Sequence, residues 1–316
     1  MDASNQFGAA RMSVALLFPG QGSQTPGFLR CLPAVGAVRD ILERSSNFLG
    51  YDVFTLDTET AMSSTISIQL GLVIAGAAFW NFLSDEGIEP RAVTGMSVGV
   101  FSAAIACGAV TLEQALKLVK RRAELMQSTF QGRAEGMAAI QGLHLVQLKS
   151  ILRGTELSIA NFNSQTQFVV AGPLRLLNSL VQQAIEAGAY KAAILATSVS
   201  SHIPLLAPAS VDLLALARQT PVQAPDKTMF SNRFARPITT AEGVREELAL
   251  NMSNPVKWHD TMTAMGGLGI TVVLESPPGH TLAGLASEII PNVRTFSAAE
   301  MRWDVVLRAA RLHQRD

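Results

Sequence analysis

The sequence RAVTGMSVGVFSAAIACG, residues 91–108, decides the fold. Residues 92–94 predict a short buried strand, and residues 98–107 predict an apolar helix. Between them, GMSVG at residues 95–99 has the form G-x-S-x-G, a sharp strand-to-helix turn that exposes a serine hydroxyl. Glycines suit the flanking positions because a Cβ there would collide with neighbouring backbone. Ser97 is therefore the candidate nucleophile, although a five-residue motif alone is weak evidence.

Strands and helices alternate on both sides of this turn. Residues 13–18 form an apolar run that ends at Pro19 and Gly20, which is the pattern of a buried strand followed by a tight turn. The order of elements predicts a parallel sheet covered by helices. The other elements predicted here are helices at 32–49, at 67–83 and from a Thr-x-x-Gln capping box at Thr111, a strand at 270–275 and a helix at 281–289.

The middle of the chain has a different order, β-α-β-β-α-β, which is the ferredoxin-like split motif. Its predicted strands are at 136–143, 156–161, 167–171 and 192–197, and its predicted helices are at 146–153 and 174–187. We therefore predict an α/β fold with a large, α/β-hydrolase-like parallel-sheet domain, residues 13–133 and 201–316. A ferredoxin-like small subdomain, residues 134–200, is inserted in it, and residues 1–12 are expected to form a flexible extension.

Composition limits the classes of function. The 316 residues include 25 Lys and Arg and 25 Asp and Glu, so the net charge is zero, and 48% of residues are hydrophobic. This excludes a disordered chain and gives no electrostatic attraction to nucleic acid. Only 16% of residues are charged, which suits a surface that associates with partners. Cys31 and Cys107 are too few for a disulfide framework, and the five histidines are scattered, so neither disulfides nor a metal site is expected.

Two stretches without charge, residues 61–84 and 92–112, are long enough to cross a membrane. Both contain several polar residues and lack flanking Lys or Arg clusters, so we interpret them as buried core segments. Residues 1–12 are polar and do not resemble a signal peptide. We expect a protein of the cytoplasm that binds no membrane.

A serine nucleophile needs a base, and three histidines compete for that role. His202 lies in the uncharged segment SVSSH, whereas His259 adjoins Asp260 and His280 follows Pro-Pro-Gly. His202 is the best candidate from spacing, and the alternative is a loop histidine that is bonded to a backbone carbonyl.

Two further features are ambiguous when each is read alone. GQGSQ, residues 20–24, follows the first strand, where backbone N–H groups could bind an oxyanion, although an ordinary glycine-rich turn is the better explanation. Arg121 and Arg122 lie in the middle of a predicted helix. Arginine can grip a carboxylate with two hydrogen bonds, but most helical arginines face solvent.

Taken together, six segments resemble the malonyl-CoA:acyl carrier protein transacylase family, in the same order. They are FPGQGSQ (18–24), GMSVG (95–99), LVKRRAELMQ (118–127), NFNS (161–164), SVSSH (198–202) and NPVKW (254–258). The resemblance runs from about residue 14 to residue 298, and six ordered motifs are far more specific than one. It implies an acyltransferase that uses malonyl-CoA as a substrate and holds no permanent cofactor.

The resemblance also implies a role for each matching residue. Ser97 would be acylated, and His202 would act as general base and then as general acid. A backbone carbonyl near Lys257 would orient the imidazole in place of the aspartate of a triad.

Three more residues receive roles from the same resemblance. The backbone N–H groups of Gln21 and Val98 would form the oxyanion hole. Arg122 would bind the free carboxylate of the malonyl group.

The chain departs from the usual family pattern at three places. Met96 replaces a histidine, Ser200 replaces a proline, and Pro277-Pro278-Gly279 replaces Gly-Pro-Gly. These features are most similar to the malonyltransferase subunit of malonate decarboxylase, whose acceptor is a dedicated carrier subunit bearing phosphoribosyl-dephospho-CoA. The expected reaction is malonyl transfer to that carrier, and the alternative is the transacylase of fatty acid synthesis.

Two other classes of function compete with transfer. A serine thioesterase or esterase would use the same turn with water as the acceptor, and it would hydrolyse short acyl thioesters without a carrier. A non-catalytic interaction subunit could keep the fold, but Ser97, His202 and Arg122 together argue against it.

Overall fold

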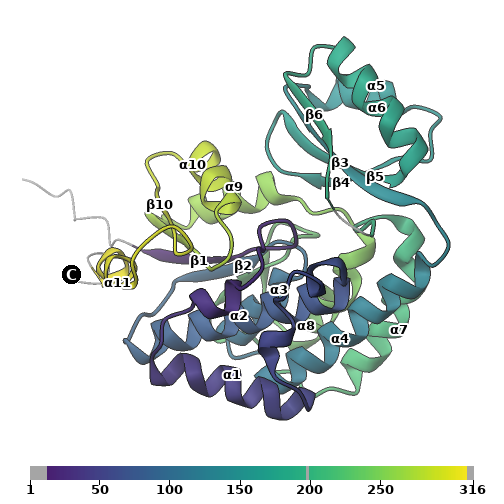
Figure 1. Cartoon of the computed structure of the whole chain (residues 1–316). Coiled ribbons are helices and arrows are strands. Elements are labelled where there is room, and N and C mark those ends of the chain that lie inside the picture. Colours follow the sequence, from purple (N-terminus) through teal and green to yellow (C-terminus); the bar gives the residue numbers. More distant parts are fainter. Residues whose placement is uncertain (1–12, 197–198, 312–316) are drawn as a thin grey trace, which may run out of the picture.

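The structure is a computed structural model that describes residues 13–196 and 199–311. The predicted flexible extension at residues 1–12 lies outside the described residues. Figure 1 shows a large lower domain and a small domain above it.

The large domain is built on a six-stranded sheet with the order β10-β9-β1-β2-β7-β8. The first five strands are parallel, as predicted, whereas β8 pairs antiparallel with β7 at the edge. The strands are β1 (Val14–Phe18), β2 (Ala92–Gly95), β7 (Thr228–Phe230), β8 (Pro237–Ile238), β9 (Val272–Glu275) and β10 (Arg294–Ser297).

Helices cover both faces of this sheet, so β1 at its centre is apolar on both sides. Val14, Leu16 and Phe18 pack into the main core with α1 to α4, and Ala15 and Leu17 pack into a second core with α9 and α10. The helices of this domain are α1 (Gly36–Leu49), α2 (Thr65–Asp85), α3 (Gly99–Ala106), α4 (Leu112–Thr129), α7 (Ala207–Arg218), α8 (Ala241–Leu250), α9 (Trp258–Gly267), α10 (Thr281–Ile289) and α11 (Trp303–Arg311). Short 3-10 turns are η1 (Phe28–Cys31), η2 (Val53–Thr55), η3 (Ala61–Ser63), η4 (Pro204–Leu206) and η5 (Asn251–Ser253).

The apolar helix α2 is a core element. Among the described residues it is the one helix long and apolar enough to cross a membrane by length and composition, and 78% of its most apolar window is buried inside the protein. Buried core helices pass the same test. Its packing against α1, α3 and α4 agrees with the interpretation of residues 61–84 as a core segment.

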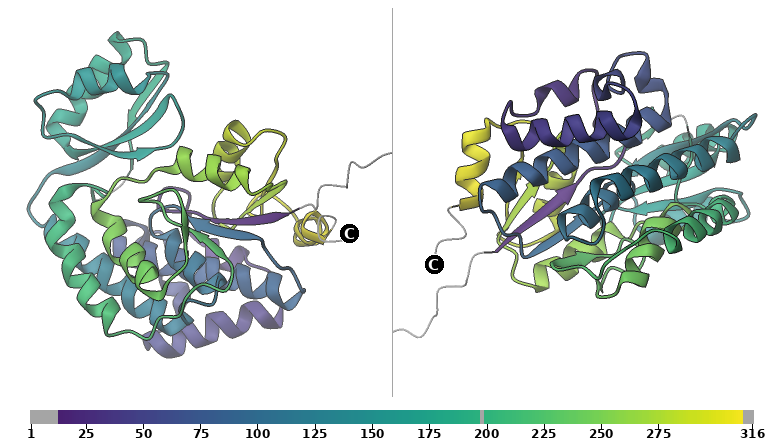
Figure 2. Two further views of the ribbon diagram at one scale, coloured as in Figure 1. Left: turned by 180° about the vertical axis from the view of Figure 1, so that it is seen from behind. Right: turned by 90° about the horizontal axis from the view of Figure 1, so that it is seen from below.

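The small domain is a four-stranded antiparallel sheet with the order β4-β5-β3-β6, the order of a ferredoxin-like fold. Its two helices lie together on one face of the sheet and enclose a core of their own (Figures 1 and 2). Its elements are β3 (Glu135–Gln141), α5 (Leu145–Leu152), β4 (Ser158–Phe162), β5 (Gln167–Pro173), α6 (Leu174–Glu186) and β6 (Lys191–Ile194).

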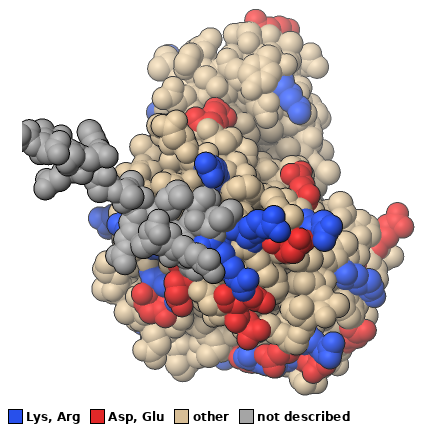
Figure 3. Space-filling view, turned by 90° about the vertical axis from the view of Figure 1, so that its left-hand side faces the viewer, with Lys and Arg blue, Asp and Glu red and all other residues tan. Residues whose placement is uncertain are grey.

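The opposite face of the small sheet joins the large domain. Met137, Val169 and Ala171 belong to the main core, and Asn161 in β4 forms a bridge with Val256 ahead of α9. The loop containing Val256 therefore touches both domains. On the face shown in Figure 3, charged side chains gather more densely over the large domain than over the small one.

Candidate active site

The serine turn forms where β2 meets α3. Ser97 has φ 55°, in the left-handed region, so the backbone is strained at the tip of the turn. A Cβ on Gly95 would lie 2.0 Å from the carbonyl carbon of Gly99, and one on Gly99 would lie 2.1 Å from the oxygen of Phe18. Both glycines are therefore required by close backbone packing. Asn232 fixes the turn, because its Oδ1 accepts a hydrogen bond of 3.1 Å from the backbone N–H of Ser97.

The structure brings His202 to Ser97. The distance from His202 Nε2 to Ser97 Oγ is 2.8 Å. His202 Nδ1 lies 2.9 Å from the carbonyl oxygen of Asn251 and 3.1 Å from that of Asn254. Since two acceptors face Nδ1, this nitrogen carries the hydrogen, and Nε2 is free to accept the serine proton.

A carbonyl near Lys257 does orient the imidazole, that of Asn254 in NPVKW, but Lys257 itself does not. The carbonyl of Lys257 accepts from the hydroxyl of Thr261, and its N–H donates to Asn232. The orienting carbonyls belong to Asn251 and Asn254, because the chain turns through η5 after α8 and leaves these two oxygens facing His202. The resemblance indicated the right loop but not the right residue.

Burial keeps the imidazole neutral. His202 is 1% exposed, and burial lowers its pKa to about 4. The charge of Arg122 contributes to this lowering of the pKa, while the bonds to Asn251 and Asn254 oppose it. At neutral pH the ring is therefore unprotonated and able to act as a base.

Arg122 also points into the site. Its Nη1 donates to Gln69 Oε1 at 2.5 Å, and its Nη2 donates to Ser97 Oγ at 3.2 Å. The residue is 1% exposed, its Nε has no hydrogen-bond partner, and no carboxylate pairs with it in the described part of the chain. Burial lowers its pKa to about 9, so the guanidinium remains charged at pH 7.

The structure shows which of the two neighbouring arginines, Arg121 or Arg122, points into the site. The side chain of Arg121 is 46% exposed, and its Nη1 lies 3.7 Å from Glu124 one turn along α4. Arg121 therefore lies on the solvated face of the helix, and Arg122 lies on the buried face.

The loop after β1 closes another side of the site. A Cβ on Gly20 would lie 2.9 Å from the carbonyl oxygen of Met96, so this loop is packed against the serine turn. Gln21 Oε1 accepts hydrogen bonds of 3.3 Å from Thr65 and from Gln69. The backbone N–H groups of Gln21 and Val98 have no acceptor among the described residues, so both are available to a ligand.

Beside these groups lies a cavity of about 710 Å³, between the start of α2 and the end of α4. Thr65 lines the cavity and bonds to both Gln21 and Gln69, which connects the cavity to the surroundings of Arg122. The contact of Gln69 with Arg122 was not predicted, although a glutamine inside an otherwise apolar helix indicates a buried polar contact.

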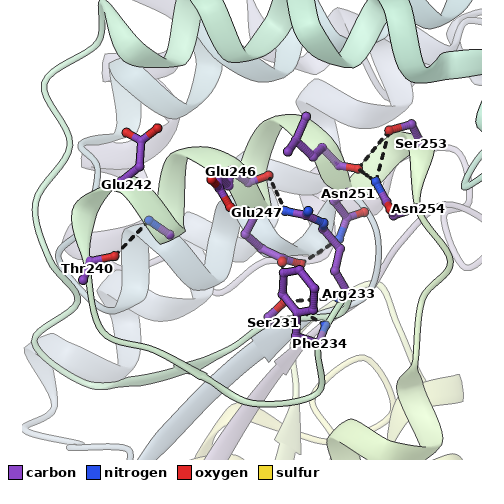
Figure 4. Close-up of polar contacts among 12 residues, drawn as sticks. Ser231, Arg233, Phe234, Thr240, Glu242, Glu246, Glu247, Asn251, Ser253 and Asn254 are labelled. Atoms are coloured by element: carbon purple, nitrogen blue, oxygen red, sulfur yellow. Dashed lines mark hydrogen bonds and ion pairs between the residues drawn. The ribbon is translucent and has the colours of Figure 1, made fainter.

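A second group of buried polar residues lies behind the dyad, and no motif in the sequence predicts it. Glu247 on α8, which is 1% exposed, accepts hydrogen bonds from Ser231 and Asn251 (Figure 4). It also accepts one from the backbone N–H of Asn232. The available signal was spacing, since Val244, Glu247 and Leu248 share the buried face of α8.

The remaining candidates lie elsewhere. His259 is 3.4 Å from Asp260 at the start of α9, and His280 precedes α10 on the surface. Within residues 13–196 and 199–311, no three His, Cys, Asp or Glu residues group as metal ligands. Of the two free cysteines, Cys31 is exposed and Cys107 is buried. The site thus combines a serine, a neutral histidine and an unpaired cation, a set suited to acylation by an acyl group that bears a negative charge.

Comparison with known proteins agrees with this arrangement. Residues 15–300 match the family described as "Acyl transferase domain". The chain is 30% identical over 297 residues to the malonyl CoA-acyl carrier protein transacylase of Haemophilus influenzae, a match that covers 91% of this chain and 95% of the relative.

Solved structures agree over nearly the whole chain. The malonyl CoA-acyl carrier protein transacylase of Coxiella burnetii superposes with a TM-score of 0.90 at 28% identity, covering 97% of this chain and 99% of the other. A malonyl-transacylase in complex with its type II PKS acyl-carrier protein superposes with a TM-score of 0.87 at 30% identity, covering 94% and 98%. The α/β fold with two sheets is shared with these structures.

Proposed function

The chain belongs to the acyl transferase domain family, and on this premise we propose that it transfers a malonyl group from malonyl-CoA to the thiol of an acyl carrier protein. The proposed intermediate is a malonyl ester of Ser97. Similarity to transacylases along nearly the whole chain supports this reaction.

One observation carries the choice of acyl group: the guanidinium of Arg122 is buried beside Ser97 without a carboxylate partner. An unpaired buried charge is costly, so a carboxylate on the substrate would be bound strongly there. A charge-assisted hydrogen bond contributes about 1.5–3 kcal/mol, enough to favour malonyl over acetyl by roughly an order of magnitude or more.

The first half-reaction acylates the enzyme. His202 Nε2 takes the hydroxyl proton as Ser97 Oγ bonds to the thioester carbon, and the N–H groups of Gln21 and Val98 would stabilise the oxyanion. The carbon–sulfur bond then breaks, and the proton on Nε2 passes to the CoA thiolate.

The second half-reaction reverses the roles. The carrier thiol gives its proton to His202 Nε2 and attacks the malonyl ester. The bond from the malonyl carbon to Ser97 Oγ breaks, and Nε2 returns the proton to the serine. Every reacting group in these two half-reactions comes from the chain or from the two substrates, so the proposed reaction needs no cofactor.

We name the acyl carrier protein of fatty acid synthesis as the first acceptor to test, because the relatives of Haemophilus influenzae and Salmonella typhimurium are named malonyl CoA-acyl carrier protein transacylases. The carrier subunit of malonate decarboxylase remains a second acceptor. Met96, Ser200 and the pair Pro277-Pro278 favour it by resemblance.

Intact-protein mass spectrometry tests the proposal. After brief incubation with malonyl-CoA, we expect a mass gain of one malonyl group on the wild-type chain and none on Ser97→Ala. Addition of either carrier should then remove the label, and the faster carrier is the acceptor. Arg121→Ala is the matched control, since this exposed neighbour of Arg122 should leave labelling unchanged.

Other outcomes would decide against transfer. Release of CoA with no adduct and no carrier product would indicate a hydrolase. An adduct that survives in Ser97→Ala would remove Ser97 from the mechanism.

A further inference from the structure

We propose that Glu247 is a positioning residue for both members of the dyad, acting through Asn232 on Ser97 and through Asn251 on His202. The inference rests on the proposed function only in taking Ser97 and His202 as the reacting pair. Glu247 itself touches neither residue in the described contacts.

The first branch leads to the serine. Glu247 Oε1 accepts a hydrogen bond of 2.9 Å from the backbone N–H of Asn232. The side chain of that asparagine in turn accepts the 3.1 Å bond from the N–H of Ser97, whose φ of 55° is strained. The carboxylate therefore fixes the residue that holds the serine turn in its strained conformation.

The second branch leads to the histidine. Glu247 Oε1 also accepts a 3.0 Å bond from Nδ2 of Asn251, and the same Nδ2 lies 3.2 Å from Asn232 Oδ1. The backbone carbonyl of Asn251 is the nearer of the two acceptors on His202 Nδ1. Holding the side chain of Asn251 thus holds the carbonyl that orients the imidazole.

A carboxylate is the group that this position requires. Its second oxygen accepts from the hydroxyl of Ser231, and that hydroxyl already accepts from two backbone N–H groups, those of Arg233 and Phe234. An amide in place of the carboxylate would turn an N–H toward a hydroxyl whose lone pairs are both occupied. Glu247→Gln therefore disturbs the network while keeping nearly the same shape.

The arrangement differs from a Ser-His-Asp triad in where the carboxylate lies. In a triad the acid bonds to the imidazole directly and stabilises its charged form. Here two neutral backbone carbonyls face His202, and Glu247 bonds to the side chain of Asn251, which provides one of them. Glu247 can therefore position the imidazole ring through Asn251, without a direct bond between carboxylate and ring. The expected effect of its loss is on the rate of serine attack and not on substrate affinity.

The test compares Glu247→Gln with Glu242→Gln. Glu242 is on the same helix but 46% exposed, where it pairs with Arg218 and Arg245, so its substitution controls for a general effect on α8. Two rates are measured: CoA release from malonyl-CoA with an acyl carrier protein present as acceptor, and covalent labelling of Ser97 by a fluorophosphonate probe. The probe reports the reactivity of the serine without any malonyl group.

We expect Glu247→Gln to lower kcat and the labelling rate by about 10- to 100-fold each, with KM for malonyl-CoA within about twofold of wild type. Glu242→Gln should match wild type in all three values. Labelling at the wild-type rate in Glu247→Gln, or a change confined to KM, would overturn the proposal.

Two further outcomes stay informative. If Glu247→Gln does not fold, Asn232→Ala removes the bond to the Ser97 N–H directly, and normal labelling in that variant would contradict the first branch. If wild-type protein releases no CoA from malonyl-CoA, the proposed function fails, but the labelling rates still decide whether Glu247 positions the dyad.

Discussion

Two buried charges are connected to Ser97, and the fold satisfies only one of them. Arg122 bonds to the serine Oγ, and its other partner is the neutral side chain of Gln69. Glu247 acts on the serine backbone through Asn232 and has three hydrogen-bond donors of its own. Both residues are 1% exposed, so the difference lies in their partners and not in their burial.

This difference in partners indicates that Arg122 binds substrate, whereas Glu247 has a structural role. A buried charge with a complete set of partners contributes to a single folded arrangement. A buried charge without a counter-ion lowers the stability of the folded protein. Such charges are kept at active sites, where a ligand of opposite charge binds to them and activity outweighs the loss of stability. On this argument the arginine side of Ser97 receives the substrate, and the glutamate side holds the machinery in place.

The largest expected effect is on stability, and the same replacement should act in opposite directions on the two sides. Arg122→Met removes an unpaired charge and should leave the protein as stable as wild type or more stable. Glu247→Met removes the acceptor of the Ser231 hydroxyl and of the Asn232 N–H, and one of the two acceptors of Asn251 Nδ2, and should cost about 3 kcal/mol or more. Urea unfolding with matched m-values measures the separation between the two variants, about 3–5 kcal/mol.

The comparison fails if the two methionine variants are destabilised equally. Leu125→Met, on the same helix as Arg122 and also buried, is a control for introducing methionine into this core.

The second prediction concerns selectivity. Arg122→Ala should lower the ratio of kcat/KM for malonyl-CoA to that for acetyl-CoA by about 10- to 150-fold, because the carboxylate loses a charge-assisted partner of about 1.5–3 kcal/mol. Arg121→Ala is the matched control on the exposed side of the same helix. An unchanged ratio in Arg122→Ala would show that Arg122 does not bind the malonyl carboxylate.

Sequence patterns predict the parts of the site that are local. GMSVG specifies the serine turn because both flanking glycines face backbone at distances that exclude a Cβ. The capping box at Thr111 and the apolar run of α2 specify their helices in the same local way, and both helices are found close to their predicted bounds.

The glutamate side could not be predicted because it is assembled from distant segments. Asn232, Glu247 and Asn251 come from a loop, a helix and a 3-10 turn, and only the folded chain aligns their hydrogen bonds. The strands β7 and β8 beside them have three and two residues, too short to show alternation. For the same reason the sequence places the carbonyl that faces His202 only near Lys257, since the course of a loop backbone decides that the oxygens of Asn251 and Asn254 are in reach.

The smallest expected effect tests an intermediate case, Glu275 at the end of β9. It is 0% exposed, one of its oxygens accepts from Ala283 N–H, and the other has no hydrogen-bond partner within residues 13–196 and 199–311, so burial raises its pKa to about 7. Between its ordinary pKa and pH 7 the folded state therefore binds more protons than the unfolded state, and stability falls as pH rises.

Glu275→Gln should remove this slope, which is on the order of 1 kcal/mol per pH unit between pH 5.5 and 6.5. The measurement is the free energy of unfolding of both proteins across that range, with Glu288→Gln, an exposed carboxyl on α10, as the control. Parallel curves for Glu275→Gln and wild type would mean that Glu275 is ionised throughout the range. Water would then supply the hydrogen bond that the second oxygen of Glu275 lacks. In that case, counting hydrogen-bond donors from the protein would no longer tell which buried charges in this fold are stabilised.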